Sequence, residues 1–291
     1  MKEITALVSR NRKLFFKDKG MLFSSMITPV ILIVLYATFL ANVYKDSFVS
    51  ATKDMIDLSD KIINGTVAAL IAVSCVTVTF CVNLTMVQDR ASGARKDFDV
   101  SPVSKTKIYI GYFLSTVLNS LMVNGTALAL CLLYILKMGW YMSASDVIFV
   151  ILDMILLVLF GSTLSSIVSY PLKTQGQLSA VGTIVSAGYG FVCGAYMPIS
   201  NFSSGLQKAL SYLPGTYGTS LVKNHMLNGV YKEMADIGLP SEAVTVIRNT
   251  LDCNPVFRGH VVGVSQMYLI MAGSIVVFGA AYLLIIMIRE R

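Results

Sequence analysis

Long apolar segments alternate with short polar segments along this chain, and the apolar ones are long enough to cross a membrane as helices. A helix needs roughly 20 apolar residues to span a hydrocarbon core of about 30 Å. Six segments meet this requirement, at residues 21–44, 62–87, 108–136, 147–170, 178–197 and 266–288. The pattern therefore predicts an all-α, polytopic membrane protein with six transmembrane helices, forming a single transmembrane domain over residues 1–291.

The first 20 residues have an amphipathic pattern of their own. At helical spacing one face is apolar and the opposite face carries lysines and arginines. The apolar face is formed by Ile4, Leu7, Val8, Leu14 and Phe15. Such a helix is suited to lie along a membrane surface with its basic side chains among the headgroups. We therefore expect residues 1–20 to form an interface helix on the inner side of the membrane.

The stretch from residue 198 to 265 is the longest segment outside the predicted spans, and it is too apolar to be a disordered loop. Three short helices are expected in it, at Phe202–Leu213, Thr216–Leu227 and Ser241–Leu251. The first should end at Pro214-Gly215 and the second at Asn228-Gly229, because proline and glycine interrupt helices. Apolar helices of half the spanning length are typical of re-entrant segments, so we expect an extracellular re-entrant region before the last span.

Composition supports the membrane class. Hydrophobic residues make up 55% of the chain and charged residues 13%, whereas about a quarter of the residues of a soluble domain are charged. The net charge of +7 comes mainly from short segments beside the spans, which indicates membrane topology and anionic lipid rather than nucleic acid. Positive residues are more numerous in the segments that would face inward, so we expect both termini in the cytoplasm of a cell-membrane protein.

The densest charge lies in the connection between the second and third spans, residues 87–107. Its charged residues are Asp89, Arg90, Arg95, Lys96, Asp97, Asp99, Lys105 and Lys107. The pattern between Asp89 and Asp99 favours a short amphipathic helix, which Ser101-Pro102 would end because the residue before a proline disfavours helical geometry. Two interpretations stay open: the connection docks onto a cytoplasmic partner, or it is a solvated turn whose positive residues fix the topology.

Two spans carry further polar or small residues. In the fifth span small residues recur every four positions, which lets another helix from the same chain or another copy approach closely. They are Gly182, Ser186, Gly190 and Gly194. The fourth span contains Asp153, and an intramembrane carboxylate is a functional candidate by default. The alternative is that Asp153 pairs with a neighbouring side chain, and we expect this structural role.

Motifs of catalysis do not occur in the sequence. There is no GxxxxGK[ST] loop for nucleotide phosphates, and neither HExxH nor GxSxG is present. The two histidines, His225 and His260, are far apart in sequence, and none of the five cysteines forms a CxxC pair. Only Cys253 is expected to be exposed. We therefore expect no catalytic residue, no metal site and no cofactor in this chain.

Several short motifs, in their order and spacing, resemble the ABC-2 family of export permeases. Residues 10–18, RNRKLFFKD, run into a span that contains Pro29. Asp89-Arg90, Gly93 and Ser101-Pro102 resemble the family's residues around its coupling helix. Residues 197–200 (MPIS) and 214–217 (PGTY) resemble its residues after the fifth span. The resemblance covers nearly the whole chain.

The resemblance implies a division of labour between chains. In that family a separate ABC ATPase subunit binds ATP and magnesium, and the connection after the second span docks onto it. In this sequence the implied coupling residues are Asp89, Arg90, Gly93, Arg95, Lys96, Ser101 and Pro102. The resemblance therefore favours docking over a merely solvated turn for residues 87–107.

The resemblance also implies a substrate path between two copies of the chain, or between this chain and a paralogous permease. The path would be bordered by the second and fifth spans. Its candidate residues are Ser74, Thr77 and Thr79 in the second span and Thr183, Val185 and Tyr189 in the fifth. Hydroxyl groups without charge suit an amphiphilic cargo better than an ion.

The function expected from these features is the permease subunit of an ATP-driven exporter that moves a drug-like, peptide or amphiphilic substrate out across the cytoplasmic membrane. Three alternatives stay open: export of a lipid-linked glycan or another envelope lipid, a channel, and a membrane-embedded enzyme. A channel predicts pore-lining charge or a filter sequence. A membrane-embedded enzyme predicts clustered His, Asp or Glu near one membrane face. Neither pattern is visible in the sequence.

Overall fold

The computed structural model describes residues 2–35, 38, 68–236, 238 and 240–289. The end of the first predicted span, the connection at 45–61 and the start of the second predicted span lie outside the described residues. The described chain is helical apart from a two-stranded hairpin, β1 (Val256–Phe257) and β2 (His260–Val261), which the sequence did not predict. The all-α class is therefore confirmed.

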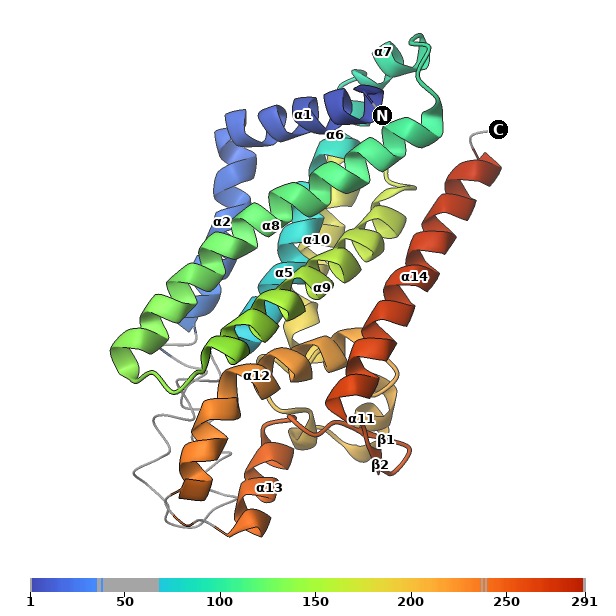
Figure 1. Ribbon diagram of the computed structural model, residues 1–291. Helices are drawn as coiled ribbons and strands as arrows, with labels where there is room; N and C mark the ends of the chain where they lie inside the picture. The colour runs from blue at the N-terminus through green and yellow to red at the C-terminus, as the bar shows by residue number, and fades with distance from the viewer. Residues whose placement is uncertain (1, 36–37, 39–67, 237, 239, 290–291) are drawn as a thin grey trace.

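The helices of the described chain follow one another as Figure 1 shows. They are α1 (Lys2–Lys17), α2 (Lys19–Leu35), α5 (Ala68–Val82), α6 (Leu84–Ala91), α7 (Arg95–Asp99), α8 (Lys105–Met138), α9 (Ala144–Ser169), α10 (Gln175–Val192), α11 (Ser204–Leu210), α12 (Pro214–Asp236), α13 (Ser241–Thr250) and α14 (Val264–Arg289). A short 3-10 helix at Ile199–Asn201 lies between α10 and α11.

Length and apolar composition identify candidate membrane spans among these helices. Within the described residues, four helices are long and apolar enough to cross a membrane: Leu70–Ala91, Lys105–Lys137, Ala144–Ser169 and Val264–Arg289. They correspond to the predicted second, third, fourth and sixth spans. The predicted first and fifth spans are represented by the shorter apolar helices α2 and α10. The chain is thus a multi-pass membrane protein, and the total of six spans stays a prediction.

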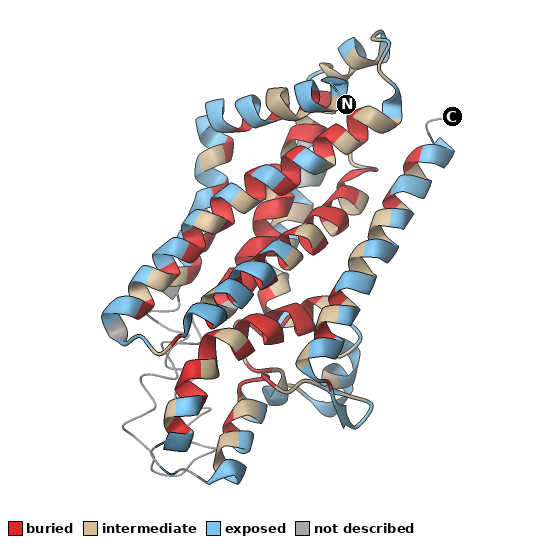
Figure 2. Cartoon of the chain, in the orientation of Figure 1, coloured by how far each residue is buried: buried red, intermediate tan, exposed pale blue. Residues whose placement is uncertain are grey.

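The bundle is organised around α5, whose described side chains are buried along the whole helix up to Phe80 (Figure 2). Its neighbours are α2, α8, α9, α10 and α12. α5 consists of apolar residues and short hydroxyl residues and has no charged face, so it can be surrounded by other helices. Thr77 donates to the Val73 carbonyl at 3.0 Å and Thr79 to the Val76 carbonyl at 2.6 Å. These hydroxyls are therefore satisfied by the helix itself and tolerate burial.

The two ends of the bundle differ (Figure 1). At one end, which we call the α1 end, lie α1, α7 and the last turns of α14. At the other, the α12 end, lie α11, α13, the hairpin and much of α12. α1 packs on α8 with Leu7, Asn11 and Phe15 buried. Of the predicted apolar face, Leu7 and Phe15 are therefore covered by protein, Ile4 and Val8 are half-buried and Leu14 is exposed. The location of this helix at the membrane surface stays a prediction.

Two predicted helix boundaries at the α12 end are wrong. α12 begins at Pro214 and runs on through Asn228-Gly229, where an end was expected. Proline is tolerated in the first turn of a helix because the N–H groups there lack helical partners anyway. Gly229 is a close-contact residue, since a Cβ at this position would overlap the Tyr141 carbonyl oxygen. α11 is shorter than predicted, whereas α13 begins at the predicted residue.

Candidate functional site

The predicted coupling connection, residues 87–107, consists of two helical pieces rather than one. α6 continues to Ala91, Gly93 turns the chain with a φ of +83°, and α7 forms a short helix before Ser101-Pro102. A positive φ is strained for residues with a Cβ, which explains glycine at this position. The continuous helix predicted between Asp89 and Asp99 is therefore wrong, while the chain does leave the helical state at the predicted stop.

Asp89 joins three helices at the α1 end. Its carboxylate accepts bonds from the Arg10 guanidinium at 2.5 and 3.1 Å and from the Tyr112 hydroxyl at 2.5 Å. Arg10 is on α1 and Tyr112 on α8, so this cluster, the Asp89 joint, ties α6 to both helices. The hydrogen bond from Arg10 to this carboxylate raises the pKa of the guanidinium. A two-pronged contact of this kind fixes orientation as well as distance.

Arg90, the next residue, is directed at the end of α9. Its guanidinium donates to the carbonyl oxygens of Tyr170 and Leu172 and to the Tyr109 hydroxyl at 3.0 Å. The last carbonyls of a helix lack helical partners, and the helix dipole favours a cation beside them. Arg95 lies over the same Tyr109 ring, 4.6 Å from its centre. Arg90 therefore closes the end of α9 and fixes α6 against it.

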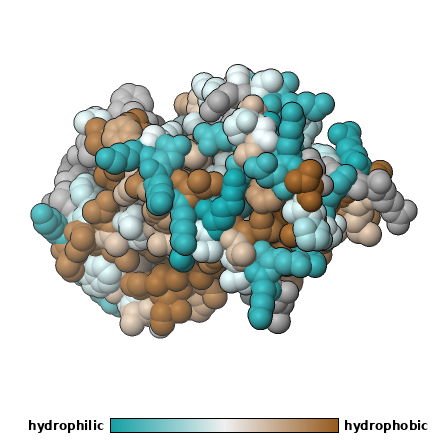
Figure 3. All heavy atoms as spheres, turned by 90° about the horizontal axis from the view of Figure 1, so that it is seen from above, coloured by the Kyte–Doolittle hydropathy of each residue, from teal (hydrophilic) through white to brown (hydrophobic). Residues whose placement is uncertain are grey.

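The exposed part of this connection begins at the end of α6 and includes much of α7 and the turn after it. Lys96, Asp97 and Pro102 are exposed, and Val100 is 87% exposed. Figure 3 looks onto the α1 end, where hydrophilic side chains project between apolar ones. The predicted coupling residues thus divide into Lys96 and Pro102, which are exposed, Asp89 and Arg90, which are bound within the chain, and Gly93, Arg95 and Ser101, which are half-buried.

Sequence reasoning missed the residues that hold this segment in place. Arg10 is one of six positive residues in the first 20, and nothing in the sequence distinguishes it from the others. Tyr109 and Tyr112 lie three residues apart, so a helix places them on one face. That spacing, next to a charged connection, is the one signal that could have found them.

A groove of about 600 Å³ lies between α2, the junction of α5 with α6, and α10. Its apolar lining includes Ile27, Phe80 and Leu84, and its hydroxyl lining includes Ser179, Thr183 and Ser186. No charged residue lines it within the described part of the chain. A mostly apolar hollow with a few hydroxyl groups is the usual character of a site for small organic ligands.

The predicted path residues of the second span do not face this groove. Ser74, Thr77 and Thr79 are buried within the bundle, and the Ser74 hydroxyl donates to the Asn124 side-chain oxygen at 2.7 Å. Thr183 of α10 does line the groove. The α5 side of the groove is formed by Phe80 and Cys81. These residues lie nearer the α1 end than Ser74, Thr77 and Thr79.

The other two predicted path residues of α10 face the interior. Val185 is half-buried against the core, and Tyr189 is half-buried with its hydroxyl beside Gly215 in the first turn of α12. A Cβ on Gly215 would overlap that hydroxyl, so the close approach requires glycine. Of the three predicted path residues on α10, Thr183 therefore lines the groove and Tyr189 contacts α12.

The four small residues that were predicted to form a packing face divide in the same way. Gly182 and Ser186 line the groove, and a Cβ on Gly182 would meet nothing within 4 Å. Gly190 is covered by the Tyr196 ring of the following turn, and Gly194 turns the chain with a φ of +72°. Half of the predicted packing face is thus occupied within the chain, and the half at Gly182 and Ser186 is open.

Asp153 is buried on α9, and its two oxygens have separate partners. One lies 2.6 Å from Nδ1 of His225 on α12, and the other accepts the Tyr268 hydroxyl of α14 at 2.6 Å. The His225 ring is stacked on Phe149 with 5.0 Å between ring centres. This cluster, the Asp153 joint, has the pairing that a structural role of Asp153 requires.

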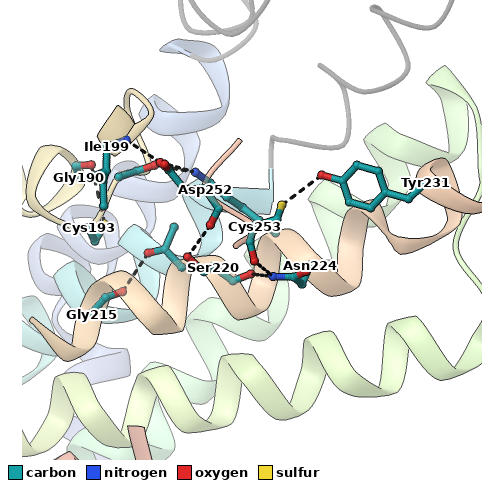
Figure 4. Close-up of polar contacts among 12 residues, drawn as sticks. Gly190, Cys193, Ile199, Gly215, Ser220, Asn224, Tyr231, Asp252 and Cys253 are labelled. Carbon is teal, nitrogen blue, oxygen red and sulfur yellow. Dashed lines mark hydrogen bonds and ion pairs between the residues drawn. The ribbon is translucent and has the colours of Figure 1, made fainter. Parts of the chain in front are cut away.

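A second buried polar cluster holds α12 against the end of α10 (Figure 4). Lys223 is fully buried, and its Nζ donates to the Gly194 carbonyl at 2.7 Å and lies 3.8 Å from the Asp252 carboxylate. Asp252 also accepts the Ile199 N–H at 2.6 Å, and burial raises the pKa of its carboxyl group. Cys253 beside it is buried, so the expectation that it is exposed is wrong.

These features define a multi-pass helical membrane protein with a charged turn exposed at one end of the bundle and an uncharged groove along its side. Compared with known families, residues 48–288 match the ABC-2 family transporter proteins. The chain therefore belongs to the ABC-2 family, as its short motifs predict, and is the permease component of an ABC transporter. Such permeases are not themselves catalytic and generally work with an ATPase subunit. No curated protein matches the chain.

Proposed function

We propose that this chain is the permease of an ATP-driven exporter in the cell membrane, with the α1 end in the cytoplasm and the α12 end outside. The greater number of lysines and arginines in the segments at the α1 end supports this orientation. A separate ABC ATPase would bind ATP and magnesium, because this chain carries no phosphate-binding loop.

The observation that supports the proposal is that α7, an exposed and charged helix, follows a helix that is held to the bundle by several side-chain bonds. α7 presents Lys96 and Asp97 to solvent. The Asp89 joint and Arg90 fix the preceding helix to α1, α8 and α9. A segment that transmits force has to be exposed where the partner binds and stiff where it is attached. Residues 87–107 have both properties, whereas a solvated turn needs neither.

The groove between α2, α5 and α10 is the proposed substrate site. Its uncharged lining suits an amphiphilic, drug-like or apolar peptide substrate. Gly182 and Ser186 at its edge leave room for a second copy or a paralogous permease, whose own groove would complete the path. Export of a lipid-linked glycan would use the same groove for the lipid part of the substrate.

Docking is tested by reconstituting the chain with its ABC ATPase in lipid nanodiscs and measuring ATP hydrolysis while drugs, peptides and lipids are screened. Lys96→Glu combined with Asp97→Lys reverses the exposed charges of α7 without changing the Asp89 joint. We expect hydrolysis to lose its stimulation by substrate while the permease still inserts. Lys173→Glu changes another exposed charge, on the turn between α9 and α10, and should behave as wild type. Full stimulation in the α7 variant would exclude this docking site.

The groove contains a native chemical probe. Cys81 lines it, whereas Cys75, Cys131, Cys193 and Cys253 are buried. A thiol reagent that enters membranes should label Cys81, and a transported substrate should slow that labelling. In Cys81→Ala the labelling should disappear. If a transported substrate leaves the labelling rate unchanged, the path lies elsewhere. Protection by lipid-linked glycans alone would support the glycan alternative.

A further inference from the structure

Helix α9 contacts the polar clusters at both ends of the bundle. At the α1 end its terminus is closed by Arg90. Nearer the α12 end Asp153 lies 2.6 Å from His225, and the Asp146 carboxylate accepts the Asn228 amide at 2.7 Å. His225 and Asn228 both belong to α12. One helix therefore links the segment that bears α7 with α12 through polar contacts.

Between these contacts Gly161, the one glycine of α9, lies directly against α5. A Cβ on Gly161 would lie 2.7 Å from Thr79 Oγ1 and 3.0 Å from Val76 Cα. The two backbones thus approach more closely than any other residue at this position would allow. Gly161 is equally far in sequence from Asp153 and from Ser169, about 12 Å along the helix in each direction. The contact divides this part of α9 into two equal arms, as a pivot would.

α9 is built as one continuous piece. Its 26 residues contain no proline, and the helix is unbroken from Ala144 to Ser169. A capping box of Ser143 and Asp146 closes its first turn. Arg90 closes its last turn, so both ends of the helix are held against fraying. A displacement applied at one end of such a helix is carried to the other end.

We propose that α9 acts as a rocker on α5: a displacement of residues 87–107 tilts α9 about Gly161 and moves α12 at the opposite end. The proposal rests on the proposed function for the source of the displacement, which is the docked ATPase. The mechanical link is a property of this chain alone. Because the arms are equal, a shift at the Arg90 end produces a shift of similar size and opposite direction at the Asp153 joint.

The link is tested by amide hydrogen exchange of the full chain in lipid nanodiscs, without ATP or partner. Arg90→Ala frees the α1 end of α9. We expect peptides of α12 to exchange about fivefold faster relative to those of α5, the smallest change typical of coupled sites. Arg10→Ala is the matched control, since it frees the same segment from α1 and should leave this ratio unchanged. An unchanged ratio in Arg90→Ala, or an equal rise in both variants, overturns the proposal.

The pivot is tested by adding a methyl group. Gly161→Ala inserts a Cβ into the contact with α5, whereas Gly273→Ala on α14 adds one where nothing lies within 4 Å. In the Gly161→Ala background, Arg90→Ala should no longer change the α12 exchange ratio. In the Gly273→Ala background it should change as in the wild-type background. If the effect of Arg90→Ala persists in Gly161→Ala, α9 does not pivot at this glycine.

A reciprocal measurement covers the case in which Gly161→Ala does not fold. Coupling between two sites is mutual, so Asp153→Asn should speed the exchange of residues 84–99 relative to α5. Unaltered exchange there would contradict the rocker. None of these measurements contains an ATPase. Failure of ATPase docking would therefore overturn the proposed function and leave the rocker unaffected. Unchanged hydrogen exchange would overturn the rocker and leave the proposed function unaffected.

Discussion

The Asp89 joint and the Asp153 joint have the same composition at opposite ends of the bundle. Each carboxylate binds one basic side chain and one tyrosine hydroxyl, and each joins three helices. The basic partner differs: Arg10 at the α1 end and His225 at the α12 end. Arg10 matches the Asp89 carboxylate with two parallel bonds, whereas His225 makes one contact with Asp153. The Asp89 joint is thus held by one more bond to its basic partner than the Asp153 joint is.

The largest effect should come from breaking the Asp89 joint. Asp89→Ala leaves Arg10 and Tyr112 without their acceptor, and we expect a loss of about 3 kcal/mol in the free energy of unfolding. Chemical unfolding of the purified protein in nanodiscs measures it. Combining Asp89→Leu with Arg10→Met removes both charges and should recover most of the stability. No recovery in the double variant would show that the position needs the ion pair itself.

The next effect is expected at the Asp153 joint. Asp153→Asn keeps the shape but weakens the contacts to His225 and Tyr268, and we expect a loss of about 1–2 kcal/mol in the same unfolding assay. Transport should persist, because in a structural role the carboxylate carries no proton. A large loss of transport rate that also makes transport independent of pH would contradict the structural role. Tyr268→Phe removes one partner alone and should cost less.

A smaller effect is expected from pH at the Lys223–Asp252 cluster. Burial raises the pKa of Asp252 above its usual 3.8, so the folded chain holds this proton at pH values where the unfolded chain has lost it. Stability from this group is therefore greatest in acid, and it falls as the pH rises from about 3.8 through the raised pKa. Hydrogen exchange of α12 and α13 across this range measures the fall. Asp252→Asn should remove the slope, and an unchanged slope would assign it to another group.

The smallest effect is expected at the exposed pair of Lys107 and Glu3. Their side chains are about half exposed and 2.8 Å apart, and solvent screens pairs of this kind. Lys107→Ala should leave the midpoint of thermal unfolding unchanged within error. A clear decrease would show that this contact reinforces the attachment of α1, and it would weaken the contrast between the two joints.

Much of the fold could be predicted because it depends on local pattern. The bounds of α9, α13 and α14 lie within a few residues of the predicted ones, since apolar length and capping residues act locally. The errors involve contacts between distant segments. Gly229 has the sequence signature of a helix end, but its role is to admit the Tyr141 backbone to α12.

The candidate site was harder to predict for the same reason. Arg10 and Asp89 are far apart in sequence, and neither is unusual in its local context. The hydroxyl residues of α5 suggested a wet path, yet Thr77 and Thr79 bond to their own helix. A hydroxyl group in a membrane helix has this local option, so sequence alone does not separate a lining residue from a buried one.

The packing of α1 on α8 has a consequence for the order of events during synthesis. The apolar face of α1 includes Leu7 and Phe15, whereas α8 begins only at Lys105. At about 5–20 residues per second, the ribosome needs roughly 5–20 s to make the intervening chain. During that interval α1 lacks α8, the helix it packs on most, although α2 and α5, which pack around Phe15, precede α8 in the chain. A membrane surface can shield the rest of the apolar face. We therefore expect the amphipathic pattern of residues 1–20 to matter first at the membrane surface, before α8 is made, and afterwards in the contact with α8.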